Sequence, residues 1–375
     1  MHRLPKHLTY GNAAQRAATN CQAIRIAKEC EREGRDATPA EQSVLSHYVG
    51  WGQTDVRSKA IAWNDSQYSR PDSLLGDMRS LYDDKLITDE EIDSIKHSAL
   101  NAHYTDPAIV HAIWEALYHL GLGAVPQPNI LEPSCGIGHF IGAGPQTSGL
   151  LIGVEKDPLT ALIARTLYSE ADIRTAGFEE VALPRVFDVV IGNVPFGNYG
   201  VRDPNHPDHL TGSIHNYFLT RSLNLLRSGG IMALITSRYT LDSEGDHVRK
   251  WLCEHGNLIG SIRLPSDAFE ENAGTQVVTD VLFFSARERP LVGRIEPWIE
   301  RSEVSYKLGR PWCRQRFLSE VCAHEDCKYA RGPVGAYYDA HPYMALGEWC
   351  QDKLAMGRTD GSVGLRTPDG ETRSI

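Results

Sequence analysis

The chain has 375 residues, of which 41% are hydrophobic and 23% charged, a composition typical of a globular protein with one large domain or two ordinary ones. Its formal net charge of −10 argues against a protein that coats nucleic acid without selectivity, although a local basic patch could still serve a DNA enzyme. No apolar run is long enough to span a bilayer, and the polar start of the chain has no apolar core of a secretory signal. We therefore expect a cytoplasmic protein with no membrane partner, whose eight scattered cysteines are reduced thiols.

The first part of the chain, residues 1–100, is predicted to be a helical region. Residues 15–33 carry apolar side chains at helical spacing, and this pattern ends at Gly34. Thr38 followed by Pro39 is typical of a helix N-cap with proline at the first helical position. A further polar helix is predicted at 83–100, and we see no residues for chemistry in this region.

Strand and helix patterns then alternate, which predicts an α/β fold with a mainly parallel sheet and helices on both faces. The strands are expected at 129–131, 150–154, 172–174, 187–191, 231–235, 258–263 and 277–284. The helices are expected at 107–120, 158–167, 214–226 and 248–253. After about residue 290 the pattern weakens, and we expect an irregular extension over 291–375 with a flexible tail.

The strand predicted at 187–191 stops at the turn Gly192-Asn193-Val194-Pro195-Phe196. In an open α/β sheet, ligands bind just beyond the carboxyl ends of the strands. An amide carbonyl accepts hydrogen bonds from an amino group, and an aromatic face stacks on a planar ring. This turn therefore predicts a pocket for a flat heterocycle with an exocyclic amino group, as in adenine.

Three more segments point to a nucleoside site at the same edge of the sheet. The turn Gly136-Ile137-Gly138 follows the first strand, but Ile141 stands where a dinucleotide fingerprint needs its third glycine. Glu155 ends the second strand, about 20 residues after the glycine turn, where an acidic residue can bind two ribose hydroxyls. Phe178 follows the third strand, either as a stacking partner for an adenine ring or as a core residue.

Together these motifs resemble the S-adenosylmethionine-dependent N6-adenine DNA methyltransferases. The sequence Asn193-Val194-Pro195-Phe196 departs by one valine from their commoner Asn-Pro-Pro-Phe/Tyr, and valine is known there in the methylase region of large bacterial and mobile-element helicase–methylase proteins. Further segments that resemble this group are 101–107, 213–218, 235–242, 272–275, 279–282 and 341–347. The resemblance implies a Rossmann-like methyltransferase domain at 101–290, between the helical region and the C-terminal extension.

The resemblance also implies roles for individual residues, with S-adenosylmethionine as the cofactor and DNA as the partner. Asn193 and the Val194 carbonyl would accept hydrogen bonds from the N6 amino group of a flipped-out adenine, with Pro195 shaping the turn and Phe196 stacking on the base. The cofactor-binding residues would be Tyr104 and Thr105 at the methionine end, Glu132, Pro133, Cys135, Gly136 and Gly138 around the amino-acid moiety, Glu155 at the ribose, and Phe178 at the adenine.

Two other functions remain open at this point. The first is a methyltransferase for RNA or for a protein glutamine amide, against which the segment His103-Tyr104-Thr105 favours the DNA adenine group. The second is a catalytically silent cofactor-binding component of a defence or anti-defence assembly, which the presence of Asn193, Phe196 and Glu155 disfavours. Because few residues follow the predicted domain, target recognition could come from the N-terminal helices, from a helicase or specificity partner, or from a larger parent chain, or selectivity could be low. The biological role could be restriction-modification, phage defence or protection of a mobile element.

Charged and metal-binding side chains outside these motifs give weaker signals. The cations Arg238, Arg249, Lys250 and Arg263, and then Arg310, Arg314 and Arg316, could contact phosphates or form a solvated face. The cluster Cys313, Cys322, His324 and Cys327 lacks the paired spacing of ordinary zinc sites, so no metal is expected.

Overall fold

The fold is organised around a central β-sheet. The computed structural model describes residues 2–51, 80–98, 104–197, 199–266, 268, 277–307, 329–351 and 363–366. The strands are β1 (Ile130–Glu132), β2 (Leu151–Glu155), β3 (Asp172–Thr175), β4 (Phe187–Asn193), β5 (Leu226–Ser237), β6 (Gly256–Leu264), β7 (Thr279–Ala286), β8 (Arg301–Lys307), β9 (Tyr329–Gly335), β10 (Glu348–Gln351) and β11 (Val363–Arg366). The helices are α1 (Ala13–Glu33), α2 (Pro39–Leu45), α5 (Asp89–Ser98), α6 (Pro107–His119), α7 (His139–Ala143), α8 (Pro158–Leu167), α9 (Ile214–Leu225), α10 (Tyr239–Asp242), α11 (His247–His255) and α13 (Ala336–Ala340).

Among the described residues, seven strands form one sheet in the order β3-β2-β1-β4-β5-β7-β6. The neighbours from β3 to β5 pair in parallel, and β7 runs antiparallel to both β5 and β6. The order reverses between β1 and β4, which is the switch point where doubly wound sheets bind their ligands. The predicted Rossmann-like, mainly parallel sheet is confirmed.

Local sequence explains where the helices begin and end. Asn12 and Gln15 form a capping box at the start of α1, and Gly34 ends it with a left-handed φ of 62°. Thr38 caps α2 in the same way, and Asp106 caps α6. The predicted helix boundaries here are confirmed within a few residues.

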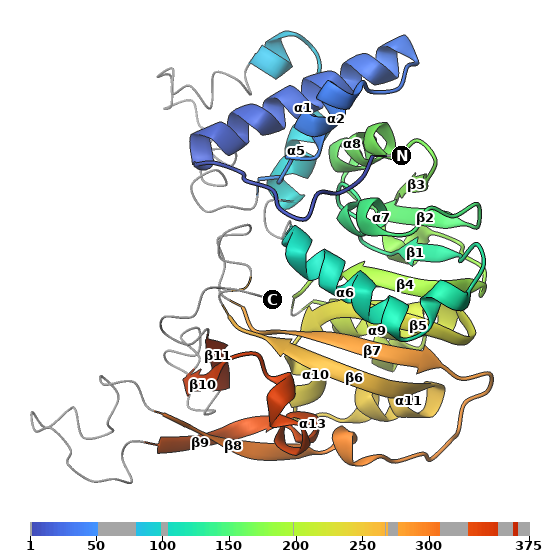
Figure 1. Cartoon of the computed structure of the whole chain (residues 1–375), viewed down its shortest axis with the longest axis vertical. Coiled ribbons are helices and arrows are strands. Elements are labelled where there is room, and N and C mark those ends of the chain that lie inside the picture. Colours follow the sequence, from blue (N-terminus) through green and yellow to red (C-terminus); the bar gives the residue numbers. More distant parts are fainter. Residues whose placement is uncertain are drawn as a thin grey trace, which may run out of the picture.

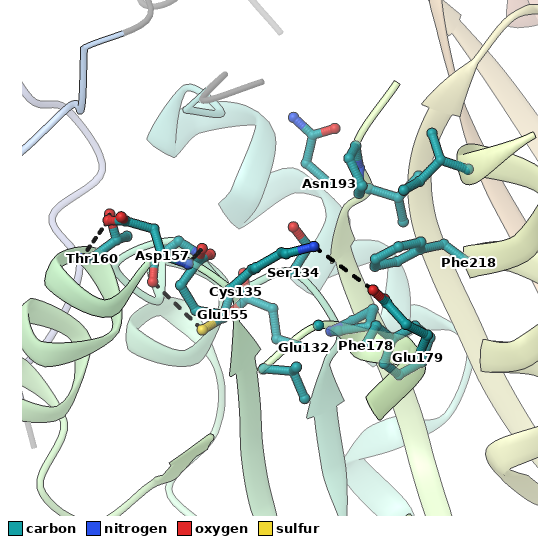
Figure 2. A pocket seen from close by; sticks show the side chains of 18 of the residues that line it. Glu132, Ser134, Cys135, Glu155, Asp157, Thr160, Phe178, Glu179, Asn193 and Phe218 are labelled. Carbon is teal, nitrogen blue, oxygen red and sulfur yellow. Dashed lines mark hydrogen bonds and ion pairs between the residues drawn. The ribbon is translucent and has the colours of Figure 1, made fainter. Parts of the chain in front are cut away.

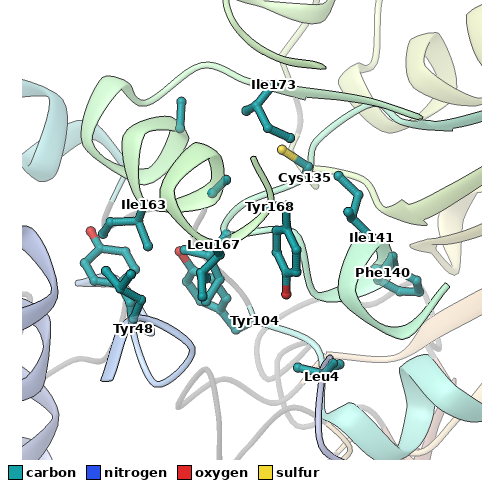
Figure 3. Packing of buried hydrophobic residues seen from close by; sticks show 14 of the residues in the cluster. Leu4, Tyr48, Tyr104, Cys135, Phe140, Ile141, Ile163, Leu167, Tyr168 and Ile173 are labelled. Atoms are coloured by element: carbon teal, nitrogen blue, oxygen red, sulfur yellow. The ribbon is translucent and has the colours of Figure 1, made fainter. Parts of the chain in front are cut away.

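Both faces of the sheet are covered, and β4 shows this residue by residue. Val189 and Ile191 belong to one hydrophobic cluster, together with side chains of α1, α6, α7 and α8. Val190, between them, belongs to a second cluster with α9 and α11. The first cluster includes Leu4 at the start of the chain, which Figure 3 shows below Phe140 and Tyr168. In Figure 1 the N-terminal helices α1, α2 and α5 lie at the β3 end of the molecule.

The chain after residue 290 has more regular structure than the sequence pattern predicts. β8 pairs with β9, and β10 with β11, each pair antiparallel. Arg263 in β6 connects this part to the sheet through two-pronged hydrogen bonds to Asp242 and Asp280, while Asp242 also accepts the Gly335 N–H at 2.8 Å. The division of the chain at 100 and 290 stays a prediction.

Candidate functional site

A pocket of about 740 Å³ opens at the carboxyl ends of β1, β2 and β4. This volume lies within the range of small-molecule sites in proteins. The pocket is lined by almost all of the predicted site residues, namely Tyr104, Thr105, Glu132, Pro133, Cys135, Gly136, Glu155, Phe178, Asn193, Val194, Pro195 and Phe196. Figure 2 shows the labelled members of this set, with Glu132 and Glu155 on one side of the pocket and Asn193 on the other.

At one end of the pocket, hydrogen bonds and packing hold the turn that follows β4 in place. The Asn193 amide nitrogen donates to the Thr105 hydroxyl at 3.1 Å. The Val194 N–H donates to the Ile235 carbonyl at 3.1 Å, which extends the β4–β5 ladder by one bond. The Val194 side chain is buried in the second cluster, and Phe196 is partly buried against both clusters. The valine that replaces the commoner proline therefore contributes core packing.

The turn after β1 places a buried acid beside the pocket. Glu132 accepts the Ile141 N–H at 3.2 Å. Burial raises the pKa of the Glu132 carboxyl well above its usual range, the Ile141 N–H partly opposes this shift, and the nearby charge of Glu155 adds to it. A cation in the pocket would favour the ionised form of Glu132.

Glu155 ends β2 with both carboxylate oxygens held by backbone. The Gly136 N–H donates to one oxygen at 2.9 Å, and the Asp157 N–H donates to the other at 2.8 Å. Burial raises the pKa of Glu155 to about 7, although the Asp157 N–H favours the charged form. Each oxygen keeps a second lone pair, so the carboxylate can still accept two hydroxyl donors.

Phe178 is both a lining residue and a core residue, so its two predicted roles coincide. Its ring centroid lies 4.9 Å from that of Phe218, and the Arg221 guanidinium lies 4.6 Å from its centroid. Arg221 in turn donates to Asp203 at 2.8 Å and to the Val181 carbonyl at 2.6 Å. This network ties the loop that comes after Phe196 to the loop that holds Phe178.

Several lining residues carry no signal that sequence reasoning detected. Ser94 in α5 lines the pocket and donates to Asp157 at 2.5 Å, so the helical region does contribute to the site. Ile214 and Phe218 in α9 also line it, and only the resemblance of the segment 213–218 pointed to them. The loop residues Tyr199, Gly200, Val201 and Arg202 complete this side, and no sequence signal marks them.

Gly138 is the predicted cofactor residue that does not line the pocket within the described part of the chain. Its φ is 85°, and a Cβ there would come within 2.7 Å of the Tyr168 ring. Tight packing against Tyr168 therefore explains this glycine.

The predicted phosphate-binding cations mostly have partners inside the protein. Arg249 is buried and donates to the Ile299 carbonyl at 2.5 Å. Arg263 is buried between two aspartates, and Lys250 pairs with Asp246 at 2.8 Å on the surface. Neither of the predicted alternatives, phosphate contact or solvated face, describes Arg249 and Arg263.

Some predictions fall outside the described residues: His103, the segment 272–275, the cations Arg310, Arg314 and Arg316, and the cluster Cys313, Cys322, His324 and Cys327. Of the helices that the structure does describe, none combines the length and the apolar character needed to cross a membrane.

Comparison with known proteins identifies the central segment. Residues 151–269 match the family described as Eco57I restriction-modification methylase. The chain is 28% identical over 242 residues to Defense against restriction protein B of Escherichia phage P1, a match that covers 60% of this chain and 10% of the relative. It is 39% identical over 77 residues to the type II methyltransferase M.CvrRI of Paramecium bursaria Chlorella virus XZ-6E, covering 20% of each. The chain thus spans a tenth and a fifth of the curated relatives that it matches.

Among solved structures, the M protein of the type I restriction enzyme EcoKI is 15% identical, with 72% of this chain and 68% of that chain covered and a TM-score of 0.41. The phage relative agrees with the predicted resemblance to a methylase region of a large mobile-element protein. Of the strands whose carboxyl ends form the pocket, β2 and β4 lie within the matched segment, and β1 lies before it. Residues 151–269 of this chain are therefore similar to the Eco57I restriction-modification methylases, and they form part of a Rossmann-like sheet.

Proposed function

We propose that this protein transfers a methyl group from S-adenosylmethionine to the N6 amino group of an adenine flipped out of DNA. The observation that carries the proposal is that Asn193 and Phe196 share one pocket with Gly136 and Glu155. In the proposed roles, an amino-group acceptor and a stacking ring would share this space with a ribose-binding carboxylate.

The donors and acceptors around the pocket fit the cofactor. Glu155 would accept the two ribose hydroxyls, and Glu132 would hold the amino group of the methionine part, with Pro133, Cys135 and Gly136 against it. Tyr104 would cover the methionine end and Phe178 the adenine. When bound, the cofactor supplies an activated methyl group, so the protein mainly has to align donor and acceptor.

At the target end, Asn193 and the Val194 carbonyl would accept the two N–H bonds of the adenine amino group. Adenine N6 is a poor nucleophile because its lone pair is delocalised into the ring, and two acceptors favour the geometry in which that pair is available. Phe196 would stack on the base. Stacking offsets part of the cost of extruding the base, which is about a few kcal/mol.

DNA as the substrate is supported by the match of residues 151–269 to the family described as Eco57I restriction-modification methylase. The two relatives are named as a defence against restriction and as a type II methyltransferase, which agrees with this substrate. Because the chain spans so little of those relatives, we propose that a helicase or specificity partner, or a larger parent chain, selects the target sequence.

The test is transfer of tritiated methyl groups from the cofactor to DNA lacking adenine methylation, to RNA and to protein, side by side. We expect N6-methyladenine in the DNA, and Asn193→Ala should abolish it while leaving cofactor binding largely intact. Labelling of RNA or protein in preference to DNA, or full activity of the Asn193→Ala variant, would contradict the proposal.

A further inference from the structure

We propose that Thr105 is a positioning residue that fixes which end of the Asn193 amide faces the target base, an inference that rests on the proposed function. The two residues are 88 positions apart in sequence and meet through one bond of 3.1 Å, from the amide nitrogen to the hydroxyl oxygen. Both line the pocket. Thr105 thus acts on the base-binding amide as well as bordering the methionine end.

The hydroxyl end of this bond is shielded from water, because Thr105 is only 4% exposed, while Asn193 is partly buried. A buried hydrogen bond competes less with solvent and constrains a side chain more than an exposed one does. The orientation of the Asn193 amide is therefore set by the protein before any base arrives.

Thr105 is itself held from both sides. Tyr104 packs against the glycine turn, since a Cβ on Gly136 would lie 3.4 Å from its ring. Asp106 caps α6 by accepting the Ala108 N–H at 2.8 Å. The hydroxyl is thus fixed relative to both the turn after β1 and the end of β4.

The two ends of an asparagine amide have similar shapes and opposite hydrogen-bonding properties. Recognition of an amino group requires the oxygen to face the base. Because the nitrogen is directed toward Thr105, the oxygen is turned away from Thr105. A rotated amide would place its N–H donors against the donors of the base. Since a threonine hydroxyl can also donate, the direction of this bond has a measurable consequence for base preference.

The test compares Thr105→Val, which keeps the shape and removes the hydroxyl, with Thr105→Ser, which keeps the hydroxyl. Methyl transfer to unmethylated DNA should lose about tenfold in kcat in the valine variant, the size expected for one oriented hydrogen bond in a dry site. Because Thr105 also borders the methionine end, we expect the KM for S-adenosylmethionine to rise by a smaller factor than kcat falls, and the serine variant should regain most of the rate.

A second readout separates orientation from general damage. Oligodeoxyadenylate presents an amino group at the purine 6-position, whereas oligodeoxyinosinate presents a carbonyl oxygen there. As competitors, the first should bind the unsubstituted chain more tightly, and the preference should shrink in Thr105→Val. Tighter binding of oligodeoxyinosinate by the unsubstituted chain would overturn the inference without any variant.

The other outcomes are equally distinct. An unchanged kcat and an unchanged base preference in Thr105→Val would overturn the inference, and so would a loss confined to cofactor KM. Absence of any transfer to DNA adenine by the unsubstituted chain would instead remove the proposed function, and this inference with it.

Discussion

We predict that the affinity for S-adenosylmethionine falls as the pH is lowered, because the role proposed for Glu155, accepting the ribose hydroxyls, requires an ionised carboxylate. Burial raises the pKa of Glu155 to about 7, so its charge changes across the neutral range. The neighbouring charge of Asp157 raises this pKa further, and Glu132 and the phenol of Tyr104 also lie in its surroundings. Protonation places a hydroxyl donor where two acceptor oxygens are needed.

The size of the effect can be worked out from the pKa. At about pH 8 roughly nine tenths of the sites carry the ionised form, and at about pH 6 roughly one tenth do, by the definition of a pKa near 7. If the ionised form alone binds, the apparent dissociation constant rises about tenfold over that interval. Bound cofactor should also lower the pKa of Glu155, with release of part of a proton.

Isothermal titration calorimetry of the cofactor at about pH 6, 7 and 8, in two buffers of different ionisation enthalpy, measures both quantities. Glu155→Gln is the matched control, since it keeps the shape and cannot titrate. That variant should bind weakly at every pH, with a flat profile. A wild-type affinity that is constant over the interval, or a glutamine variant that retains the wild-type slope, would refute the reasoning.

Two further changes test the packing around the site, by urea unfolding. Gly138→Ala should lower the free energy of unfolding by about 2–4 kcal/mol, because it combines a positive φ with a clash against Tyr168. Gly34→Ala should lower it by only about 1 kcal/mol, because Gly34 has a φ of 62° but no heavy atom within 4 Å of the added Cβ. Equal costs would show that the Tyr168 contact is unimportant. Arg263→Met should cost about 3–5 kcal/mol because it leaves two buried carboxyls without their cation, while removal of the half-exposed Arg227 charge should cost under about 1 kcal/mol. A loss below about 1 kcal/mol for Arg263→Met would mean that the aspartates find other partners.

The sheet and the end of the pocket lined by Asn193 could be predicted because their sequence signals are local. An apolar run that ends in Gly192-Asn193-Val194-Pro195-Phe196 specifies both a strand and the turn at its carboxyl end. Glu155 could be placed because its distance from the glycine turn reflects one strand–helix–strand unit. Both inferences need only the chain between neighbouring strands.

The remaining features depend on contacts between distant segments. Ser94 reaches the pocket because α5 packs beside α8 and binds Asp157, 63 residues further along the chain, and nothing in its neighbourhood indicates this. The burial of Arg249 and Arg263 could not be predicted, because a sequence shows a charge without showing its partner. In the sequence, Gly138 looks like a ligand-binding glycine. The structure gives another reason for it, because a side chain at this position would collide with the ring of Tyr168.

The hydrogen bonds between the start of the chain and the α6–α7 region limit how this protein can be divided into fragments. The Leu4 N–H donates to the Gly142 carbonyl at 3.1 Å, and His111 in α6 lies 3.2 Å from the Leu4 carbonyl. A fragment that begins at residue 101 would lack both Leu4, with its two hydrogen bonds, and Ser94. This loss would expose apolar surface on α7 and α8, which favours aggregation. Truncation of the N-terminal region, or fusion of a reporter to the first residues, should therefore perturb the pocket, even though these residues are far from it in sequence.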